Sequence, residues 1–198
     1  PPNAPTATAA TSVSYNKFTA NWNSVSGATK YYLDVYTKGA NATDLIISEY
    51  VEGSGNNKAI ELYNGTGSSI NLSNYSLKKQ VNGDGEFVNE LTLSGTLANG
   101  DTYVIVSNAG TTNLADSNFV NLATNSQALN FNGNDAVALY KNGVQIDVVG
   151  VVNQVANWGA DVTLVRKSSV TSPTTSYNTE QWDMYDQNDV SHLGSHTM

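Results

Sequence analysis

The stretch that decides the fold spans residues 44–80 and reads DLIISEYVEGSGNNKAIELYNGTGSSINLSNYSLKKQ. Apolar and polar residues alternate in two runs of this stretch, which is the pattern of half-buried β-strands. The loop between the two runs, residues 51–58, is rich in Gly, Ser and Asn, the residues that tight turns favour. The stretch therefore predicts two neighbouring strands joined by a polar loop.

The segments on either side repeat this pattern. Short runs of β-branched and aromatic residues, bounded by Gly, Asn or Asp, recur at residues 17–25, 30–38, 87–95, 101–108, 135–143 and 144–152. The pair Asn142-Gly143 joins the last two runs in the manner of a two-residue hairpin. Regularly spaced short strands of this kind indicate an all-β fold, either a sandwich or a barrel of antiparallel strands.

Alternation of side chains along a strand also predicts which way individual residues face. It puts Glu61 on the face opposite Ile60 and Asp147 on the face opposite Ile146, so we expect both carboxylates to be solvated or ion-paired. Residues 111–131 fit neither the helical nor the strand period for long. For them we expect a long surface excursion with one short helix or irregular turns.

Composition narrows the classes of function. The 198 residues include 17 acidic and nine basic side chains, and the resulting net charge of −8 disfavours nucleic acid as a partner. The absence of cysteine excludes disulfides and thiolate zinc sites. Only 13% of the residues are charged, and a polar but uncharged surface suits an exported protein. No apolar run reaches the length of a membrane span, and residues 1–12 lack signal-peptide character, so we expect a soluble chain.

The beginning of the chain differs from the rest. It combines a Pro-containing lead, a strand with Trp22, and a strand with Tyr31 and Tyr32. This segment resembles the first three strands of a fibronectin type III domain, with Trp22 at the position of that family's core tryptophan. The resemblance ends before the remaining strands of such a domain. We therefore expect a partial fibronectin type III-like segment with a linker at residues 1–41 and one large domain at residues 42–198.

Four motifs of the large domain resemble those of a known family. They are AIELYN at 59–64, LSNYSL at 72–77, LANGDTYVIVS at 97–107 and NDAVALYKNG at 134–143. As a set they resemble the lamin tail domain, although Tyr75 stands where that family often has tryptophan. The resemblance implies an immunoglobulin-like antiparallel β-sandwich.

The resemblance also implies a function. Bacterial domains of this kind are accessory modules of exported proteins, among them nucleases and phosphoesterases, or parts of cell-surface proteins. It therefore implies a non-catalytic interaction or targeting module, located outside the cell or on its surface, with a protein or polysaccharide as partner. A structural spacer or assembly domain without a ligand of its own is the alternative.

The sequence offers no catalytic residues. Its histidines, His192 and His196, lie at the very end, where we expect a mobile tail rather than a catalytic or metal site. No serine occupies the G-x-S-x-G motif of a nucleophile elbow. Residues 81–87, VNGDGEF, lack the further oxygen ligands of a calcium loop and predict a hairpin turn instead. We therefore expect that the chain is not an enzyme.

Two polar loops supply candidate ligand-binding residues. Glu52, Asn56 and Asn57 lie in the first loop, and Asn134 and Asp135 precede a later strand. If the two loops meet at one end of the sandwich, their oxygens and amides suit a hard cation such as Ca²⁺ or the hydroxyl groups of a sugar. Alternatively, the Gly and Asn residues serve only to shape the turns.

The tryptophans of the large domain allow two readings. Trp158 and Trp182 either fill the open end of the sandwich or, if exposed, form a platform on which a sugar stacks. The sequence around Arg166 and Lys167 is the densest basic spot, and it is too small for a nucleic-acid patch.

Overall fold

The computed structural model of the chain describes residues 4–14, 17–33, 41–109 and 113–198. The chain forms two compact units, Pro1–Lys38 and Gly39–Met198. Among the described residues, no helix is long and apolar enough to cross a membrane.

The small unit contains an antiparallel hairpin of strands β1 (Ala7–Ser14) and β2 (Lys17–Trp22). The rings of Trp22 and Tyr31 lie 5.5 Å apart, but Trp22 remains 38% exposed. The described part of the third strand expected here, residues 30–33, forms no strand, and its remainder lies outside the described residues. An isolated two-stranded hairpin is marginally stable in water.

The large unit is built almost entirely of strands. They are, in chain order, β3 (Ile46–Glu52), β4 (Lys58–Tyr63), β5 (Ile70–Asn71), β6 (Tyr75–Gln80), β7 (Phe87–Thr92), β8 (Thr96–Leu97), β9 (Thr102–Ser107), β10 (Val120–Thr124), β11 (Val137–Lys141), β12 (Val144–Val149), β13 (Val162–Arg166) and β14 (Trp182–Asp186). Short 3₁₀ helices connect some of them, namely η1 (Leu72–Asn74), η2 (Val81–Gly83), η3 (Asn113–Asp116), η4 (Gln127–Leu129) and η5 (Thr179–Gln181).

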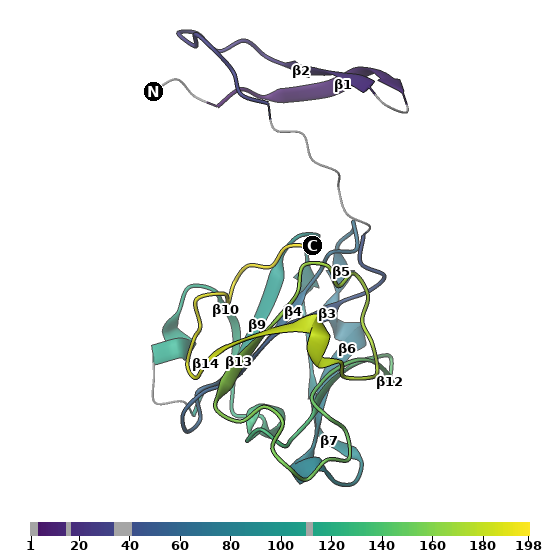
Figure 1. Ribbon diagram of the computed structural model, residues 1–198, viewed down its shortest axis with the longest axis vertical. Coiled ribbons are helices and arrows are strands. Elements are labelled where there is room, and N and C mark those ends of the chain that lie inside the picture. The colour runs from purple at the N-terminus through teal and green to yellow at the C-terminus, as the bar shows by residue number, and fades with distance from the viewer. Residues whose placement is uncertain (1–3, 15–16, 34–40, 110–112) are drawn as a thin grey trace. The chain divides into compact units, whose positions relative to one another are not determined.

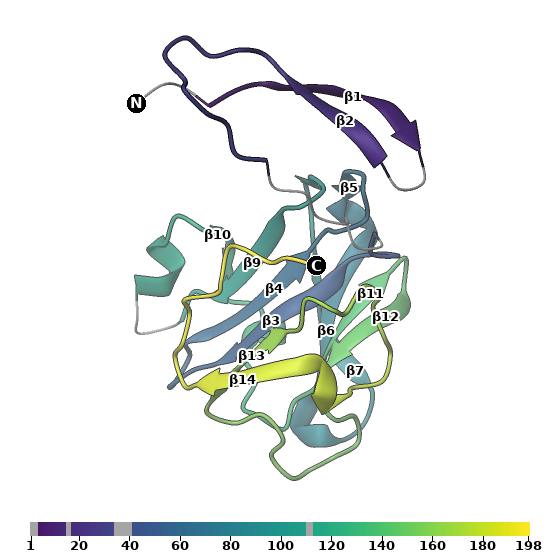
Figure 2. The same cartoon turned by 45° about the horizontal axis from the view of Figure 1, so that its top comes forward.

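Two sheets pack face to face in this unit (Figures 1 and 2). Among the described residues, one sheet has the order β10-β9-β4-β3-β13-β14 and the other β12-β11-β6-β7. The apolar side chains between them form the main core, with Leu45, Tyr50, Ile105 and Phe131 among its buried members. The predicted all-β sandwich is confirmed. Its ladders are antiparallel except for the parallel pair of β9 and β10.

Two turn predictions are also confirmed. Asn142 and Gly143, with φ of 49° and 79°, join β11 to β12 as a tight hairpin. Residues 81–87 contain η2 and connect β6 to its antiparallel neighbour β7.

The prediction for residues 111–131 is wrong in part. This segment contains β10, which runs parallel to β9, between the 3₁₀ helices η3 and η4. Leu129 and Phe131 at its end are fully buried in the main core rather than at the surface. The strand has only five residues, which is too short for a clear period, and its parallel neighbour is recognisable only after the chain has crossed over. Residues 111 and 112 lie outside the described part.

Asp147 faces the interior because of a β-bulge. Leu139 pairs with Asp147 and Tyr140 with Gln145, so Ile146 is an extra residue that breaks the alternation of β12. Asp147 therefore points between the sheets and is fully buried. The ion pair expected as one option for this residue is present, but it lies inside the sandwich.

The partner of Asp147 is Arg166 on the opposite sheet. Its Nη2 donates to Asp147 Oδ1 over 3.0 Å, and the backbone amides of Ile47 and Thr174 donate to the same carboxylate at 2.8 and 3.0 Å. The guanidinium also lies 4.6 Å from the ring centre of Trp182. Arg166 is thus an interior crosslink, not part of a basic surface spot.

Trp158 and Trp182 belong to a row of neighbouring aromatic rings in the sandwich. Ring centres are 5.3 Å apart between Tyr50 and Trp158, 5.5 Å between Trp158 and Tyr177, and 6.3 Å between Tyr177 and Trp182. Trp182 is buried and Trp158 half-buried, as expected for residues that fill the sandwich. Gly150, with φ of 104°, lies against the Trp158 ring where any Cβ would collide. The alternative of an exposed sugar platform is wrong for this pair.

We predict that Asp147→Asn destabilises the protein by about 3–5 kcal/mol, because it leaves the Arg166 charge buried without a counterion. Urea unfolding followed by tryptophan fluorescence measures the change. The control is Lys167→Ala, which removes the exposed ion pair with Asp183 and should cost less than about 1 kcal/mol. Equal and small effects of both substitutions would contradict the role given to the buried pair.

Candidate functional site

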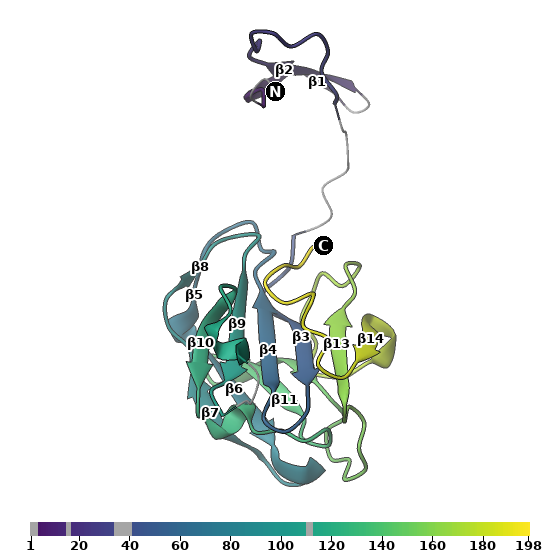
Figure 3. The same cartoon turned by 90° about the vertical axis from the view of Figure 1, so that its left-hand side faces the viewer.

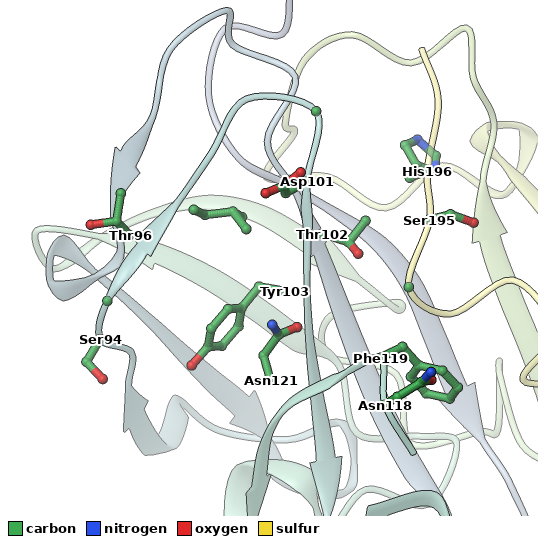
Figure 4. Close-up of a pocket in the computed structure, with 14 residues that line it drawn as sticks. Ser94, Thr96, Asp101, Thr102, Tyr103, Asn118, Phe119, Asn121, Ser195 and His196 are labelled. Carbon is green, nitrogen blue, oxygen red and sulfur yellow. The ribbon is translucent and has the colours of Figure 1, made fainter. Parts of the chain in front are cut away.

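A polar hollow lies beside the edge of the six-stranded sheet (Figure 4). Its volume is about 460 Å³, within the range of small-ligand sites. It is formed by the turn between β8 and β9, the start of β9, the residues around the start of β10, and the C-terminal segment. The lining residues are Ser94, Gly95, Thr96, Leu97, Gly100, Asp101, Thr102, Tyr103, Asn118, Phe119, Asn121, Gly194, Ser195 and His196.

The hollow exists because β10 is shorter than its neighbour. β10 begins at Val120 opposite Val104, so the preceding residues of β9 have no strand beside them on that side. The amide of Val104 points away from β4 and donates to Asn121 Oδ1 over 2.7 Å. Thr102 lies two residues earlier on the same strand, so its backbone N–H and C=O point the same way. The sheet edge therefore offers both a donor and an acceptor to the hollow.

The side chains around the hollow keep unused hydrogen-bonding capacity. Within the described ranges, the side chains of Asp101, Asn118 and Ser94 and the hydroxyl of Tyr103 have no hydrogen-bond partner. Figure 4 shows the Tyr103 ring beside Asn121. A mixture of hydroxyl, amide and aromatic groups with one carboxylate suits sugar hydroxyls or peptide groups better than phosphate.

His196 belongs to the same wall and is held in place. Its ring lies 4.9 Å from the Tyr63 ring, and burial, with the charge of Arg166, lowers the pKa of His196 to about 4. The imidazole is therefore neutral at neutral pH. The expectation of a mobile tail is wrong for this residue and for Leu193, which is buried, because apolar contacts with the sheet anchor the end of the chain.

The two polar loops predicted as a ligand site do lie at one end of the sandwich. The loop that carries Trp158 and Gly159 joins them, because both amides donate to the Gly133 carbonyl while the amide of Asp161 donates to Glu52 Oε2 over 2.5 Å. Their acidic groups nevertheless have internal partners. Glu52 is buried and forms an ion pair with Lys58.

The remaining candidates vary in exposure. Asp135 is buried, lies 3.5 Å from Lys79 Nζ and accepts from the amide of Asn82 at 2.5 Å. Asn134 donates to the carbonyl of Val155 at 2.8 Å. Asn57 is buried and donates to Ser54 Oγ at 3.2 Å. Asn56 is exposed and lines a smaller hollow of about 210 Å³. A ligand role for these five residues stays a prediction, and their contacts favour the shaping of the loops.

The described residues contain no group of three or more His, Asp and Glu side chains arranged to hold a metal ion. The hollow around Tyr103 is not predicted by the sequence. The turn residues before β9 were visible as a motif, but their approach to residues 118–121 and 194–196 depends on the folded chain. In the sequence, the polar run Asn-Gly-Asp at residues 99–101 is the one indication of this site, and these residues are exposed in the structure.

We predict that millimolar Ca²⁺ leaves the melting temperature within about 1 °C of its value in EDTA, because lysines already neutralise Glu52 and Asp135. Differential scanning calorimetry of the whole chain measures this. A rise of several degrees in the wild type that disappears in Glu52→Gln would instead assign a cation to the loop cluster. Glu86→Gln, an exposed substitution elsewhere, is the control.

Comparison with known proteins is consistent with this architecture. A search of curated proteins finds no match. The family model described as Lamin Tail Domain matches residues 38–153, more than half of the chain. Domains of this family are generally non-catalytic interaction modules, and no catalytic family is detected. The chain belongs to the lamin tail domain family.

Proposed function

We propose that this chain is a non-catalytic module that attaches an exported bacterial protein to a polysaccharide or protein surface. Family membership supports the non-catalytic part of the proposal. The low share of charged residues, 13%, supports a location outside the cell or on its surface. In this proposal the chain is of the bacterial extracellular type, and its first unit is the remnant of a fibronectin type III-like domain.

We infer the kind of partner from the residues that line the polar hollow beside β9. It combines the half-buried ring of Tyr103 with a stretch of β9 that has no strand beside it and with the exposed polar side chains of Asp101 and Asn118. A sugar needs an apolar surface for its C–H face and several donors and acceptors for its hydroxyls, and the hollow supplies both. The net charge of −8 favours neutral over acidic polysaccharides.

We predict that the purified chain binds a neutral polysaccharide through this hollow. Co-sedimentation with insoluble cellulose, chitin and xylan identifies the polymer, and ¹⁵N NMR with the matching soluble tetrasaccharide locates the site. Asp101→Ala combined with Asn118→Ala should weaken binding about tenfold or more, since each lost hydrogen bond contributes about 1 kcal/mol. Both side chains are exposed and have no hydrogen bond to another described residue, so the fold should survive.

The control for this experiment is Asn132→Ala, an exposed amide away from the hollow, which should bind as the wild type does. Shift changes centred on Glu52 and Asn134 would move the site to the polar loops. Absence of binding to all three polymers would contradict the polysaccharide partner, and capture of a defined surface protein through the hollow would replace it.

A second candidate function, assembly, is favoured by the small unit. The side chains of Val13 and Phe18 on its hairpin are 71% and 47% exposed, and Tyr32 is 82% exposed. Apolar side chains on an open hairpin are typical of surfaces that pair with another chain. We predict self-association that increases with concentration in light scattering and that Phe18→Ser reduces. A strictly monomeric protein at millimolar concentration would exclude this role.

A further inference from the structure

Two glutamates face each other on the outer side of the six-stranded sheet. Glu49 on β3 pairs in register with Glu61 on β4, and each is only 1% exposed. A β-bulge at Ser48 places an additional residue opposite Glu61, whose Oε1 accepts a hydrogen bond from Ser48 Oγ at 2.6 Å. Alternation correctly put Glu61 opposite Ile60, but the expected solvation is wrong because another part of the chain covers this face.

The cover is the C-terminal strap, residues 187–198. Figure 3 looks onto the sheet and shows the yellow end of the chain running across it. The amide of Gly194 donates to Glu61 Oε2 over 2.7 Å, and Thr163 Oγ donates to the carbonyl of Asp189 over 2.8 Å. The strap also contributes Val190 and Leu193 to an apolar cluster with the sheet residues Val51, Ala59, Val104 and Val106.

Gly194 fixes the path of the strap at the point where it meets Glu61. Its φ is 93°, a conformation that residues with a Cβ rarely adopt. A Cβ at this position would also lie 2.7 Å from the Cβ of Phe119. The strap can therefore follow this path over the sheet only with a glycine at residue 194.

No described cation neutralises the two glutamates. Glu49 Oε1 is buried and has no hydrogen-bond partner among the described residues. The charged groups around it are Glu61 on β4 and Asp189 on the strap, both acidic, while His192 of the strap lies 4.0 Å from Asp189. On β13 the register neighbour of Glu49 is Val165, and Arg166 is bound to Asp147. Two carboxylates in a dry site without a counterion cannot both ionise without strain on what covers them.

We propose that the C-terminal strap is a pH-dependent closure, which stays on the sheet while the Glu49–Glu61 pair carries protons and lifts off as the pair ionises. Ionised carboxylates must be hydrated, and water reaches this pair most directly when the strap moves away from the sheet. Lifting the strap uncovers the apolar patch of Val51, Ala59, Val104 and Val106 and removes Ser195 and His196 from the wall of the polar hollow.

The direction of the pH dependence follows from the protonation equilibria. Burial, together with the charges of Glu61 and Asp189, raises the pKa of Glu49 from 4.5 to about 9, and burial also raises the pKa of Glu61. The stability that the Glu49 proton gives is complete below pH 4.5 and is lost as the pH rises toward 9. His196 acts oppositely, because its pKa falls from 6.5 to about 4 and its contribution is lost as the pH falls through that interval.

The pH range of opening is therefore alkaline. Between pH 4.5 and 6.5 the titrations of Glu49 and His196 oppose each other, so the strap should remain closed. Above pH 6.5 the contribution of His196 is constant, whereas the loss of the Glu49 proton continues and raises the opening equilibrium by up to tenfold per pH unit.

The test is a methyl NMR titration of the whole chain from pH 5 to pH 10. The methyl groups of Leu193 and Val190 report the strap, those of Leu77 report the main core, and the ¹³C carboxyl signals of glutamate report ionisation. We expect the Leu193 signals to shift toward exposed values above pH 6.5 while the Leu77 signals stay constant. Unchanged Leu193 signals up to pH 10, or simultaneous loss of the Leu77 signals, would overturn the proposal.

A variant separates the acid pair from other alkaline effects. Glu49→Gln keeps the shape of the side chain without its charge, so the strap should stay closed through pH 10. Glu90→Gln removes an exposed carboxylate on β7 and should titrate as the wild type does. An unchanged alkaline transition in Glu49→Gln would overturn the proposal, and because the wild-type titration decides independently, poor folding of the variant would not leave it untested.

Discussion

The ion pair between Asp147 and Arg166 is the constraint on which the sandwich depends. It joins β12 of one sheet to β13 of the other, and the amide of Ile47 on β3 donates to the same carboxylate. A buried ion pair contributes little net stability compared with apolar packing, but its geometry is exacting and the loss of one partner is costly. It therefore fixes how the two sheets align, and the stack of Arg166 on Trp182 extends that alignment to the edge strand β14.

Acidic side chains are also buried on the other face of the six-stranded sheet, but they are stabilised in a different way. Asp147 has an arginine, whereas Glu61 accepts hydrogen bonds from Ser48 Oγ and the amide of Gly194. Glu49 Oε1 has no hydrogen-bond partner among the described residues, and the C-terminal strap covers both glutamates. The sheet is thus covered on both faces, by the second sheet and by the strap. This explains why β3 and β4 are buried along their whole length, unlike strands of a sandwich that face water on one side.

The same strap links this covered face to the polar hollow. Gly194 binds Glu61, and the next two residues, Ser195 and His196, form one wall of the hollow beside β9. A module of this kind needs no catalytic group, because a rigid sandwich presents the edge of β9 and the surrounding loops to a partner. In our proposal, the position of the strap decides both the protection of the sheet face and the shape of the binding surface.

The sequence by itself determined the fold class, seven strands of the large domain (β3, β4, β6, β7, β9, β11 and β12), the tight turn at Asn142-Gly143 and the family, because alternation and turn chemistry are local properties. It also placed Glu61 on the correct face. It could not place Asp147, because the bulge at Ile146 depends on pairing with β11. It missed β10 and the anchoring of His196 for a related reason. Parallel pairing, the cover over a sheet face and the walls of a hollow join residues distant in the chain, and only the tertiary structure brings them together.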